Sequence, residues 1–148
     1  MGLCLRYTKN ETDAMEALNT GFYKVFKNIQ KYEPAKASMY TWIRTIVVNS
    51  CLDHIKIKQK TIQPLELTST PDIEIDPEII SKMKSAHLLH LVRKLAPATQ
   101  TVFNLFIIEG YSHKEIAQLL QISDGTSKWH LSAARKQLQK LLNEEDIN

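Results

Sequence analysis

The chain has few cysteines, few glycines and no long apolar run. Of its 148 residues, 2 are Cys and 4 are Gly. Cys4 and Cys51 belong to no CxxC pair and have no His spacing typical of zinc, so we expect no metal and two free, buried thiols in a reducing compartment. No apolar run approaches the about 18 residues of a membrane span, and the N-terminus lacks the basic and then apolar order of a signal peptide. These absences predict a cytoplasmic protein that is not inserted in a membrane.

Charge divides the chain into three parts. Residues 1–60 carry a net charge of +5, residues 61–80 carry −5 with no Lys or Arg, and residues 81–148 carry +3. The acidic stretch also contains three prolines, which suits an extended linker better than a helix. We therefore predict a domain at 1–60, an acidic linker at 61–80 and a second domain at 81–148. The two basic ends suit contacts with a polyanion.

Helical periodicity predicts an all-α fold in the first domain. One helix spans 13–29 and ends before Pro34. Ser38 can cap a second long helix, and residues 1–7 look like the tail of a helix whose beginning is absent. The expected buried positions are Ala14, Leu18, Phe22, Val25, Phe26 and Ile29 on the first helix and Ile43, Ile46, Val47, Ser50, His54 and Ile55 on the second. Another side of the second helix carries Trp42, Thr45, Asn49, Asp53 and Lys56.

The second domain is predicted to contain four helices. The first begins near Ser81. The second begins at Pro97, a position that suits proline, and ends at Gly110, a position that suits glycine. Their expected core residues are Leu88, Leu91, Val92, Leu95, Val102, Phe103, Phe106 and Ile107.

The last two predicted helices form a helix-turn-helix. Ser112 and Glu115 have the spacing of a capping box, so a helix should begin at His113. Ser123 can cap the following helix, which should begin near Asp124. This arrangement is typical of proteins that place a second helix in the major groove of DNA.

The last helix has an apolar stripe and a polar, basic face. The stripe contains Leu131, Ala134, Leu138, Leu141 and Leu142. The other face carries Thr126, Trp129, His130, Ser132, Ala133, Lys136 and Lys140, flanked by Lys128 and Arg135. Small polar groups beside cations suit base edges and phosphates. A solvated amphipathic helix is the simpler alternative, and Trp129 could equally pack on the neighbouring domain.

Catalysis is not expected. Cys51, Asp53 and His54 offer a nucleophile and a base, but Cys51 and His54 share the apolar face of their helix, and no glycine-rich turn lies near them. We predict no enzyme activity, cofactor or small-molecule substrate.

Several motifs together resemble the small extracytoplasmic-function sigma factors of the sigma-70 family. They are Phe22-Tyr23-Lys24-Val25-Phe26, Trp42-Ile43-Arg44-Thr45-Ile46 through Asn49 to Asp53-His54, Glu109 to Ala117, and Gly125-Thr126-Ser127-Lys128. The resemblance implies two helical domains, the second of the winged-helix-like or sigma region 4 type. Gln121 stands where the family usually has a turn glycine, at a cost of about 1 kcal/mol if its backbone is left-handed.

The resemblance also implies partners and sites. The partners are core RNA polymerase, promoter DNA and an anti-sigma factor. Duplex DNA at the −35 element would meet Thr126, Ser127, Lys128, Trp129, His130, Ser132, Arg135 and Lys136. The melted −10 element would meet Lys36, Ser38, Met39, Tyr40, Trp42, Asn49, Asp53 and Lys56, and polymerase would meet Asp13, Glu16, Asn19, Thr20 and Tyr23.

Two alternatives remain open from the sequence. One is a stand-alone helix-turn-helix regulator, and the other is a truncated sigma-like protein that acts by protein interaction. Residues 36–56 favour the sigma factor, because their aromatic, amide and basic groups suit single-stranded DNA.

Overall fold

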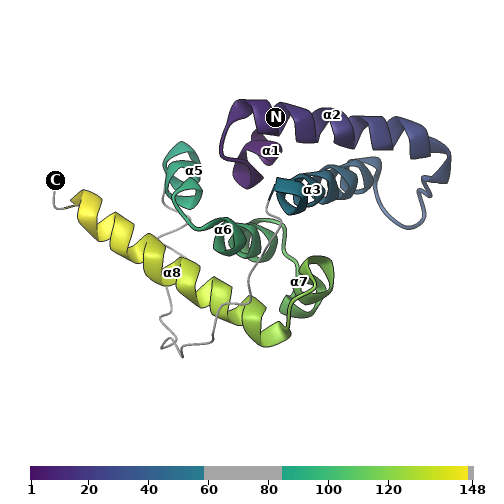
Figure 1. The fold of residues 1–148 in the computed structure, drawn as a ribbon. Helices are drawn as coiled ribbons and strands as arrows, with labels where there is room; N and C mark the ends of the chain where they lie inside the picture. Colours follow the sequence, from purple (N-terminus) through teal and green to yellow (C-terminus); the bar gives the residue numbers. More distant parts are fainter. Residues whose placement is uncertain (59–84, 147–148) are drawn as a thin grey trace. The chain divides into compact units, whose positions relative to one another are not determined.

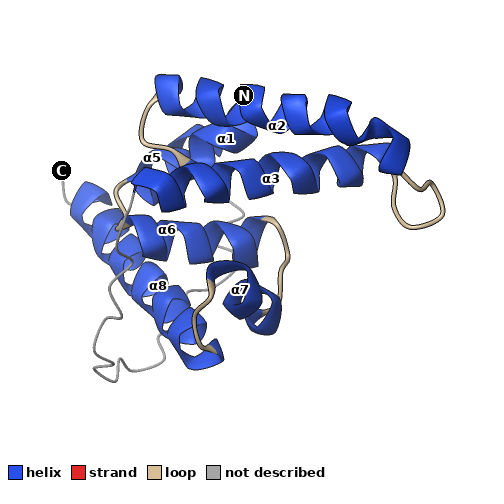
Figure 2. Ribbon diagram, turned by 45° about the vertical axis from the view of Figure 1, so that its right-hand side comes forward, coloured by secondary structure: helices blue, strands red, loops and turns tan. Residues whose placement is uncertain are grey.

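The computed structural model describes residues 1–58 and 85–146, and these form helices joined by short turns with no β-strand (Figures 1 and 2). The all-α prediction is confirmed. The chain divides into two compact units, Met1–Ile62 and Gln63–Asn148. The predicted acidic linker at 61–80 lies outside the described residues. Within the described ranges, no helix has both the length and the apolar character that a bilayer span requires.

The first unit consists of a short helix packed against a helical hairpin. Its elements are α1 (Gly2–Tyr7), α2 (Glu11–Asn28), the 3-10 turn η1 (Ile29–Lys31) and α3 (Met39–Lys58). Helices α2 and α3 lie side by side in both ribbon views, and α1 packs against both (Figures 1 and 2). The Asn10 side chain caps α2 by accepting a hydrogen bond from the Asp13 amide (2.8 Å). Ser38 caps α3 as predicted, since its hydroxyl accepts from the Thr41 amide (3.2 Å).

The predicted buried face of α2 is partly wrong. The side packed against α3 carries small residues, Ala14, Ala17 and Gly21, together with Val25. Phe22, Phe26 and Ile29 were expected in the core but are 41%, 74% and 43% exposed. Close approach of the two helices explains the difference, because even a Cβ on Gly21 would lie 3.2 Å from the Val47 Cα. The large side chains therefore point away from α3.

The core of α3 is also displaced from the predicted stripe. Val47 and Ser50 are buried as expected, but Val48, Cys51 and Leu52 complete the buried set. The remaining predicted members, Ile43, Ile46, His54 and Ile55, are half-buried. Because α1 and α2 both pack against α3, its buried surface is broader than a single stripe.

The second unit wraps shorter helices around a long one. Its elements are α5 (Ser85–Arg93), α6 (Pro97–Phe103), the π-helical turn η2 (Asn104–Ile108), α7 (His113–Leu120) and α8 (Asp124–Asp146). Helices α5, α6 and α7 all contact α8. The predicted core residues Leu91, Val92, Leu95, Val102 and Phe103 are buried. As predicted, Pro97 occupies the start of α6.

The π-helical turn changes the register of the predicted second helix of this unit. Phe106 and Ile107 were expected in the core but are half-buried, and Leu105 is fully buried instead. A π-helical turn has more residues than an α-turn, so the residues after it face a different direction. Gly110 ends the segment with a φ of 78°, which a glycine adopts without the strain of a side chain.

Candidate nucleic-acid interfaces

The helix-turn-helix has the local geometry that its sequence predicts. The Ser112 hydroxyl accepts a hydrogen bond from the Glu115 amide, and Glu115 Oε2 accepts from the Ser112 amide (2.8 Å) and hydroxyl (2.7 Å). These hydrogen bonds lower the pKa of the Glu115 carboxyl. Helix α7 therefore begins at His113 with its N-terminus capped from both sides.

The turn after α7 depends on a strained residue and a second cap. Gln121 adopts the left-handed conformation (φ 56°, ψ 45°), at a cost of about 1 to 2 kcal/mol for a residue other than glycine. The Ser123 hydroxyl then accepts a hydrogen bond from the Thr126 amide (3.0 Å) and caps α8. A shallow hollow at this turn is lined by Lys114, Ala117, Gln118, Ile122 and Asp124.

Most of the predicted DNA-facing residues of α8 are accessible. Lys128 and Lys136 are exposed, and Thr126, Trp129, Ser132, Ala133 and Arg135 are half-buried. The opposite side of α8 packs into the unit through Leu131, Ala134 and Leu138. Lys128 forms an exposed ion pair with Asp124 one turn earlier (3.3 Å), which is easily exchanged for another anion because surface pairs of this kind contribute little.

The predicted exposure of Ser127 and His130 is wrong. Ser127 is 0% and His130 is 4% exposed. The Ser127 hydroxyl hydrogen-bonds His113 Nδ1 of α7 (2.9 Å), and His130 Nδ1 hydrogen-bonds the Thr99 hydroxyl of α6 (3.1 Å). Both side chains join α8 to neighbouring helices, so we leave them out of the proposed DNA-contacting surface.

Burial favours the neutral form of the two histidines that make these bonds. Burial lowers the pKa of the His130 ring. Burial also lowers the pKa of the His113 ring, although the charge of Asp124 opposes this shift. The His113 ring stacks on Phe106 with 4.4 Å between ring centroids. His113 and Thr99 were not identified from the sequence, because their partners lie on other helices.

The loop between α2 and α3 forms the second candidate interface. Tyr32 closes the loop by donating its hydroxyl hydrogen to the Ala37 carbonyl (3.1 Å), and its ring lies 5.4 Å from that of Trp42. Tyr40 is 70% exposed. Arg44, which sequence reasoning missed, donates to the Tyr40 hydroxyl (3.0 Å) and lies near its ring. An aromatic ring beside a cation is thus presented to solvent.

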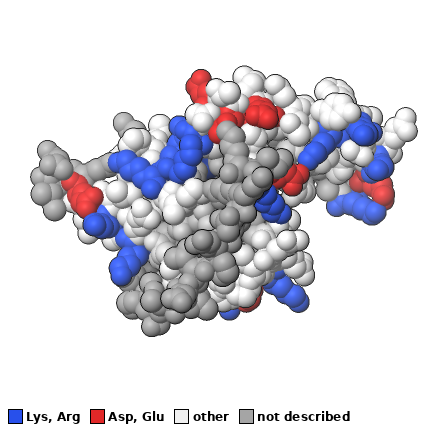
Figure 3. Space-filling model, viewed as in Figure 1, with Lys and Arg blue, Asp and Glu red and all other residues white. Residues whose placement is uncertain are grey.

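The other residues predicted at the −10 interface lie on the loop and along α3. Lys36, Ser38, Met39, Asp53 and Lys56 are exposed, and Trp42 and Asn49 are half-buried. Asp53 is paired with Lys24 of α2 (2.9 Å). Figure 3 shows Lys and Arg side chains gathered at the loop end of the hairpin, where the exposed cations are Lys27, Lys31 and Lys36. This end of the unit can attract a nucleic-acid strand.

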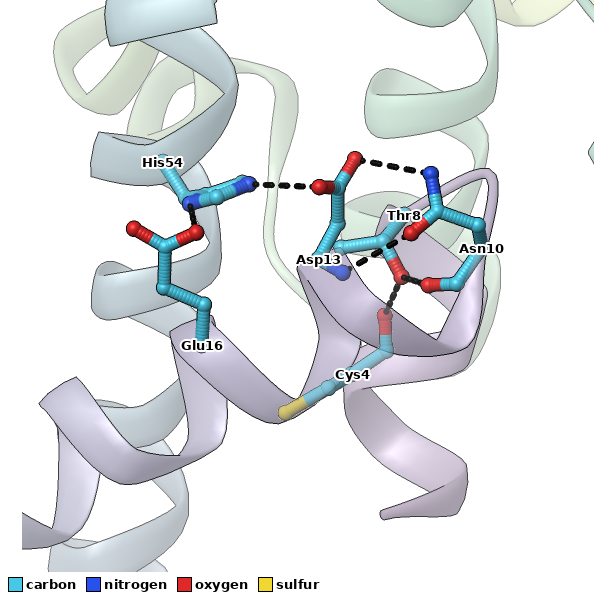
Figure 4. Close-up of polar contacts among 6 residues, drawn as sticks. All are labelled: Cys4, Thr8, Asn10, Asp13, Glu16 and His54. Carbon is cyan, nitrogen blue, oxygen red and sulfur yellow. Dashed lines mark hydrogen bonds and ion pairs between the residues drawn. The ribbon is translucent and has the colours of Figure 1, made fainter.

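The predicted polymerase-binding residues divide into two groups. Asn19, Thr20 and Tyr23 are exposed on α2. Asp13 and Glu16 instead lie beside His54 of α3: Asp13 Oδ1 is 3.6 Å from Nε2 and Glu16 Oε2 is 4.0 Å from Nδ1 (Figure 4). The two ring nitrogens face different carboxylates, so these residues bridge the two helices, and one ligand atom from each of the three lies within 4.8 Å of the others. The Asp13 side chain is only 14% exposed.

An exposed apolar surface on α2 was missed by the sequence analysis. It consists of Met15, Phe22 and Phe26 of α2 together with Ile29, the first residue of η1, and Asn19 and Tyr23 continue it around the helix. Their spacing of seven, four and three residues places the four apolar side chains on one face. We call this surface the α2 apolar face. Its periodicity was visible in the sequence but was assigned to the core.

Comparison with known proteins gives matches to both units. The family model for sigma-70 region 2 matches residues 1–61, and that for sigma-70 region 4 matches residues 86–138. The RNA polymerase sigma factor CarQ of Myxococcus xanthus is 26% identical over 148 residues, which cover 99% of this chain and 84% of that protein. The ECF RNA polymerase sigma factor SigE of Mycolicibacterium smegmatis is 27% identical over 146 residues, which cover 95% of this chain and 56% of that protein.

A solved structure has the same fold. It is the sigma factor RpoE of Bartonella quintana, which was crystallised with the anti-sigma factor NepR. Its TM-score is 0.61 at 18% sequence identity, with 96% of this chain and 88% of that chain covered. The two family regions occur here in the same order as the two compact units. This chain therefore belongs to the sigma-70 family of RNA polymerase sigma factors, in its extracytoplasmic-function group.

Proposed function

We propose that this chain is a sigma factor that directs core RNA polymerase to a set of promoters. The unit Gln63–Asn148 reads the −35 element in duplex DNA, and the unit Met1–Ile62 binds polymerase and captures the melted −10 strand. The observation that carries this proposal is the presence of sigma-70 regions 2 and 4 on one chain. A stand-alone regulator has no need for the first of these regions.

The −35 contact is made by the accessible side of α8. Lys128, Arg135 and Lys136 can neutralise phosphates, and Thr126 and Ser132 offer hydroxyl groups that suit base edges. The buried bonds from Ser127 and His130 to α7 and α6 fix the direction in which these groups point. Binding to duplex DNA should consequently weaken as the salt concentration rises.

The −10 contact is made by the α2–α3 loop and the start of α3. Tyr40 offers an exposed ring on which an unstacked base can lie, and Arg44 supplies positive charge beside it. Lys36 of the loop, which is paired with Glu33 at the surface (2.9 Å), is a second exposed cation of this unit. Trp42 packs against the ring of Tyr32, whose hydroxyl is hydrogen-bonded to the Ala37 carbonyl across the loop. Met39, which was also predicted at this interface, is exposed at the first position of α3.

Core polymerase binds the α2 apolar face. An exposed apolar surface of this kind, with Asn19 and Tyr23 at its border, is typical of a protein interface. By analogy with the complex formed by the Bartonella quintana protein, an anti-sigma protein is the second partner. We propose that the chain itself catalyses no reaction and that it acts on promoter DNA in the cytoplasm.

In vitro transcription tests this proposal. The purified chain and core RNA polymerase are incubated with genomic DNA fragments, and the transcripts are mapped by sequencing their 5′ ends. We expect transcripts that start downstream of a shared pair of promoter elements and depend on the chain. The absence of any promoter-dependent transcript would overturn the proposal in favour of a regulator or an interaction protein.

A matched pair of variants separates strand capture from duplex reading. Tyr40→Ala should retain duplex binding but abolish the permanganate reactivity of thymines in the opened −10 element. Tyr23→Ala, which removes an exposed ring of α2 away from the loop, should leave strand opening intact once polymerase is saturating. Equal loss of permanganate reactivity in both variants would contradict the assignment of Tyr40.

A further inference from the structure

The two cysteines of the chain, 47 positions apart in the sequence, meet in the core of the first unit. Cys4 lies on α1 and Cys51 on α3, which pack against each other, and both side chains are 0% exposed. The Cys51 side chain is within hydrogen-bonding reach of the Cys4 thiol. The sequence analysis expected two isolated thiols, and neither has a role in the proposed contacts with DNA or polymerase.

The backbone around Cys4 is held in place. The Cys4 carbonyl oxygen accepts hydrogen bonds from the Thr8 hydroxyl (3.0 Å) and the Thr8 amide (3.1 Å), as Figure 4 shows for the hydroxyl. The Thr8 hydroxyl also contacts the Asn10 carbonyl (3.2 Å), which connects the end of α1 to the cap of α2. The Cys4 side chain is thus kept against α3, where Cys51 is fixed in the middle of a long helix.

The environment makes Cys4 more reactive than an ordinary buried thiol. Burial alone raises a thiol pKa and makes the group inert. Here the Cys51 side chain and, to a smaller extent, the charge of the Met1 amino group lower the pKa of Cys4 to about 7, although burial opposes this shift. A substantial fraction of Cys4 is therefore thiolate near neutral pH, and the thiolate is the form that attacks peroxides and disulfides.

We propose that Cys4 and Cys51 are a redox modification site, which a hydroperoxide converts to an intramolecular disulfide between α1 and α3. The Cys4 thiolate attacks the peroxide, the O–O bond breaks, and Cys4 becomes a sulfenic acid as hydroxide leaves and takes up a proton. The Cys51 sulfur then attacks the sulfenic sulfur, and the S–S bond forms as a second water leaves. The two sulfurs lose two electrons together, and one hydroperoxide is reduced.

Access to the buried thiols comes through α1. This helix has only six residues, and no side chain caps its N-terminus. A short helix without a side-chain cap opens locally at low free energy, so hydrogen peroxide can reach the pair without unfolding of the α2–α3 hairpin. Once formed, the disulfide fastens α1 to α3 and closes the chain between residues 4 and 51. We expect it to raise the melting temperature of the first unit by about 10 °C.

The experiment uses the full chain, reduced and then exposed to hydrogen peroxide in native buffer at pH 7. The peroxide is removed, the remaining thiols are blocked with N-ethylmaleimide in urea because both side chains are buried in the folded chain, and the intact mass is measured. We expect a monomer that has lost two hydrogens, carries no maleimide and yields a linked peptide pair containing Cys4 and Cys51. The amount of peroxide is one that oxidises dithiothreitol completely. A chain that carries two maleimides after this exposure would overturn the proposal, as would a disulfide that forms only when the chain is oxidised in urea.

The variants Cys51→Ser and Cys4→Ala test the assigned roles. In Cys51→Ser the serine hydroxyl can still donate the hydrogen bond that favours the Cys4 thiolate, but no second sulfur is present, so dimedone should trap a sulfenic acid at Cys4 and the loss of two hydrogens should disappear. In Cys4→Ala the trapping at Cys51 should be at least about tenfold slower, because its thiol stays protonated. Equal trapping in both variants would refute Cys4 as the attacking residue. None of these measurements requires polymerase or DNA, so they stand apart from the proposed function.

Discussion

Replacing Gly21 by alanine should loosen the α2–α3 hairpin. A Cβ at this position would lie 3.1 Å from Val47 Cγ2 and 3.2 Å from Val47 Cα, closer than the about 3.5 to 4.0 Å of a favourable carbon contact. A side-chain rotation could relieve the first contact. The second involves the backbone of α3, so relief requires one helix to move.

The expected magnitude follows from two opposing terms. Overpacking of a close helix contact costs about 1 to 3 kcal/mol. Alanine is a better helix former than glycine by about 1 kcal/mol, which offsets part of this cost. We therefore expect Gly21→Ala to lower the free energy of unfolding of the first unit by about 1 to 2 kcal/mol.

Gly125 provides a matched control in the other unit. A Cβ there would have only the Ser123 hydroxyl oxygen within 4 Å, at 3.8 Å, which is an ordinary contact. Gly125→Ala should therefore raise the stability of its unit by a few tenths of a kcal/mol up to about 1 kcal/mol. The two substitutions are chemically identical and differ in the space that the fold leaves.

Each unit has its own fluorescent reporter for this experiment. Trp42 belongs to the first unit and Trp129 to the second, so a Trp129→Phe background reports on Gly21→Ala and a Trp42→Phe background on Gly125→Ala. For a unit of this size, 1 to 2 kcal/mol corresponds to a shift of about 1 M in the urea midpoint. An unchanged or higher midpoint for Gly21→Ala would refute a close α2–α3 contact at this residue.

Three further predictions concern the interfaces and the buried histidine. Lys136→Ala should weaken duplex binding and reduce the salt slope by about one unit, whereas Asn49→Ala should spare duplex affinity and impair strand opening; equal losses of duplex affinity would show that the two units do not divide these tasks. Phe26→Ala should change the free energy of unfolding of the first unit by less than about 0.5 kcal/mol and still weaken core polymerase binding. Val25→Ala, which removes a buried side chain, should lower that free energy by about 1 kcal/mol or more. Unaltered polymerase affinity of the Phe26→Ala variant would argue against the α2 apolar face as the binding surface. Burial lowers the pKa of His130 in the folded state, so the unfolded chain binds the His130 proton more readily and the stability of the second unit should fall as the pH drops below about 6.5. Urea titrations at pH 7.5 and 5.5 measure this fall, which should be smaller in His130→Gln. A fall of the same size in the variant would show that another group causes it.

Local signals in the sequence were enough to locate most helix ends. The Ser112 and Glu115 capping box, Pro97 at the start of α6, Gly110 after η2 and Ser123 before α8 all have the predicted geometry. Each of these residues acts on the backbone within about four positions, either through a hydrogen bond from its side chain to a nearby amide or through its own preferred φ angle. The sequence therefore determined the helix-turn-helix and the order of the helices before any packing was known.

The direction in which each helix face points depended on tertiary structure. The periodicity of α2 showed an apolar side containing Phe22 and Phe26, but the fold buries the side with Gly21 because only small residues allow α3 to approach so closely. For the same reason the polar character of Ser127 and His130 suggested solvent, whereas partners on α7 and α6 satisfy them in the interior.

The meeting of Cys4 and Cys51 likewise depended on the fold. Their separation of 47 positions carries no local signal, because a contact between distant residues arises only when α1 packs on α3. Sequence by itself determined where the helices begin and end and which family they belong to. Tertiary structure decided which side chains face a neighbouring helix and which are left for a partner, because burial is a property of two complementary surfaces and one helix supplies only one of them.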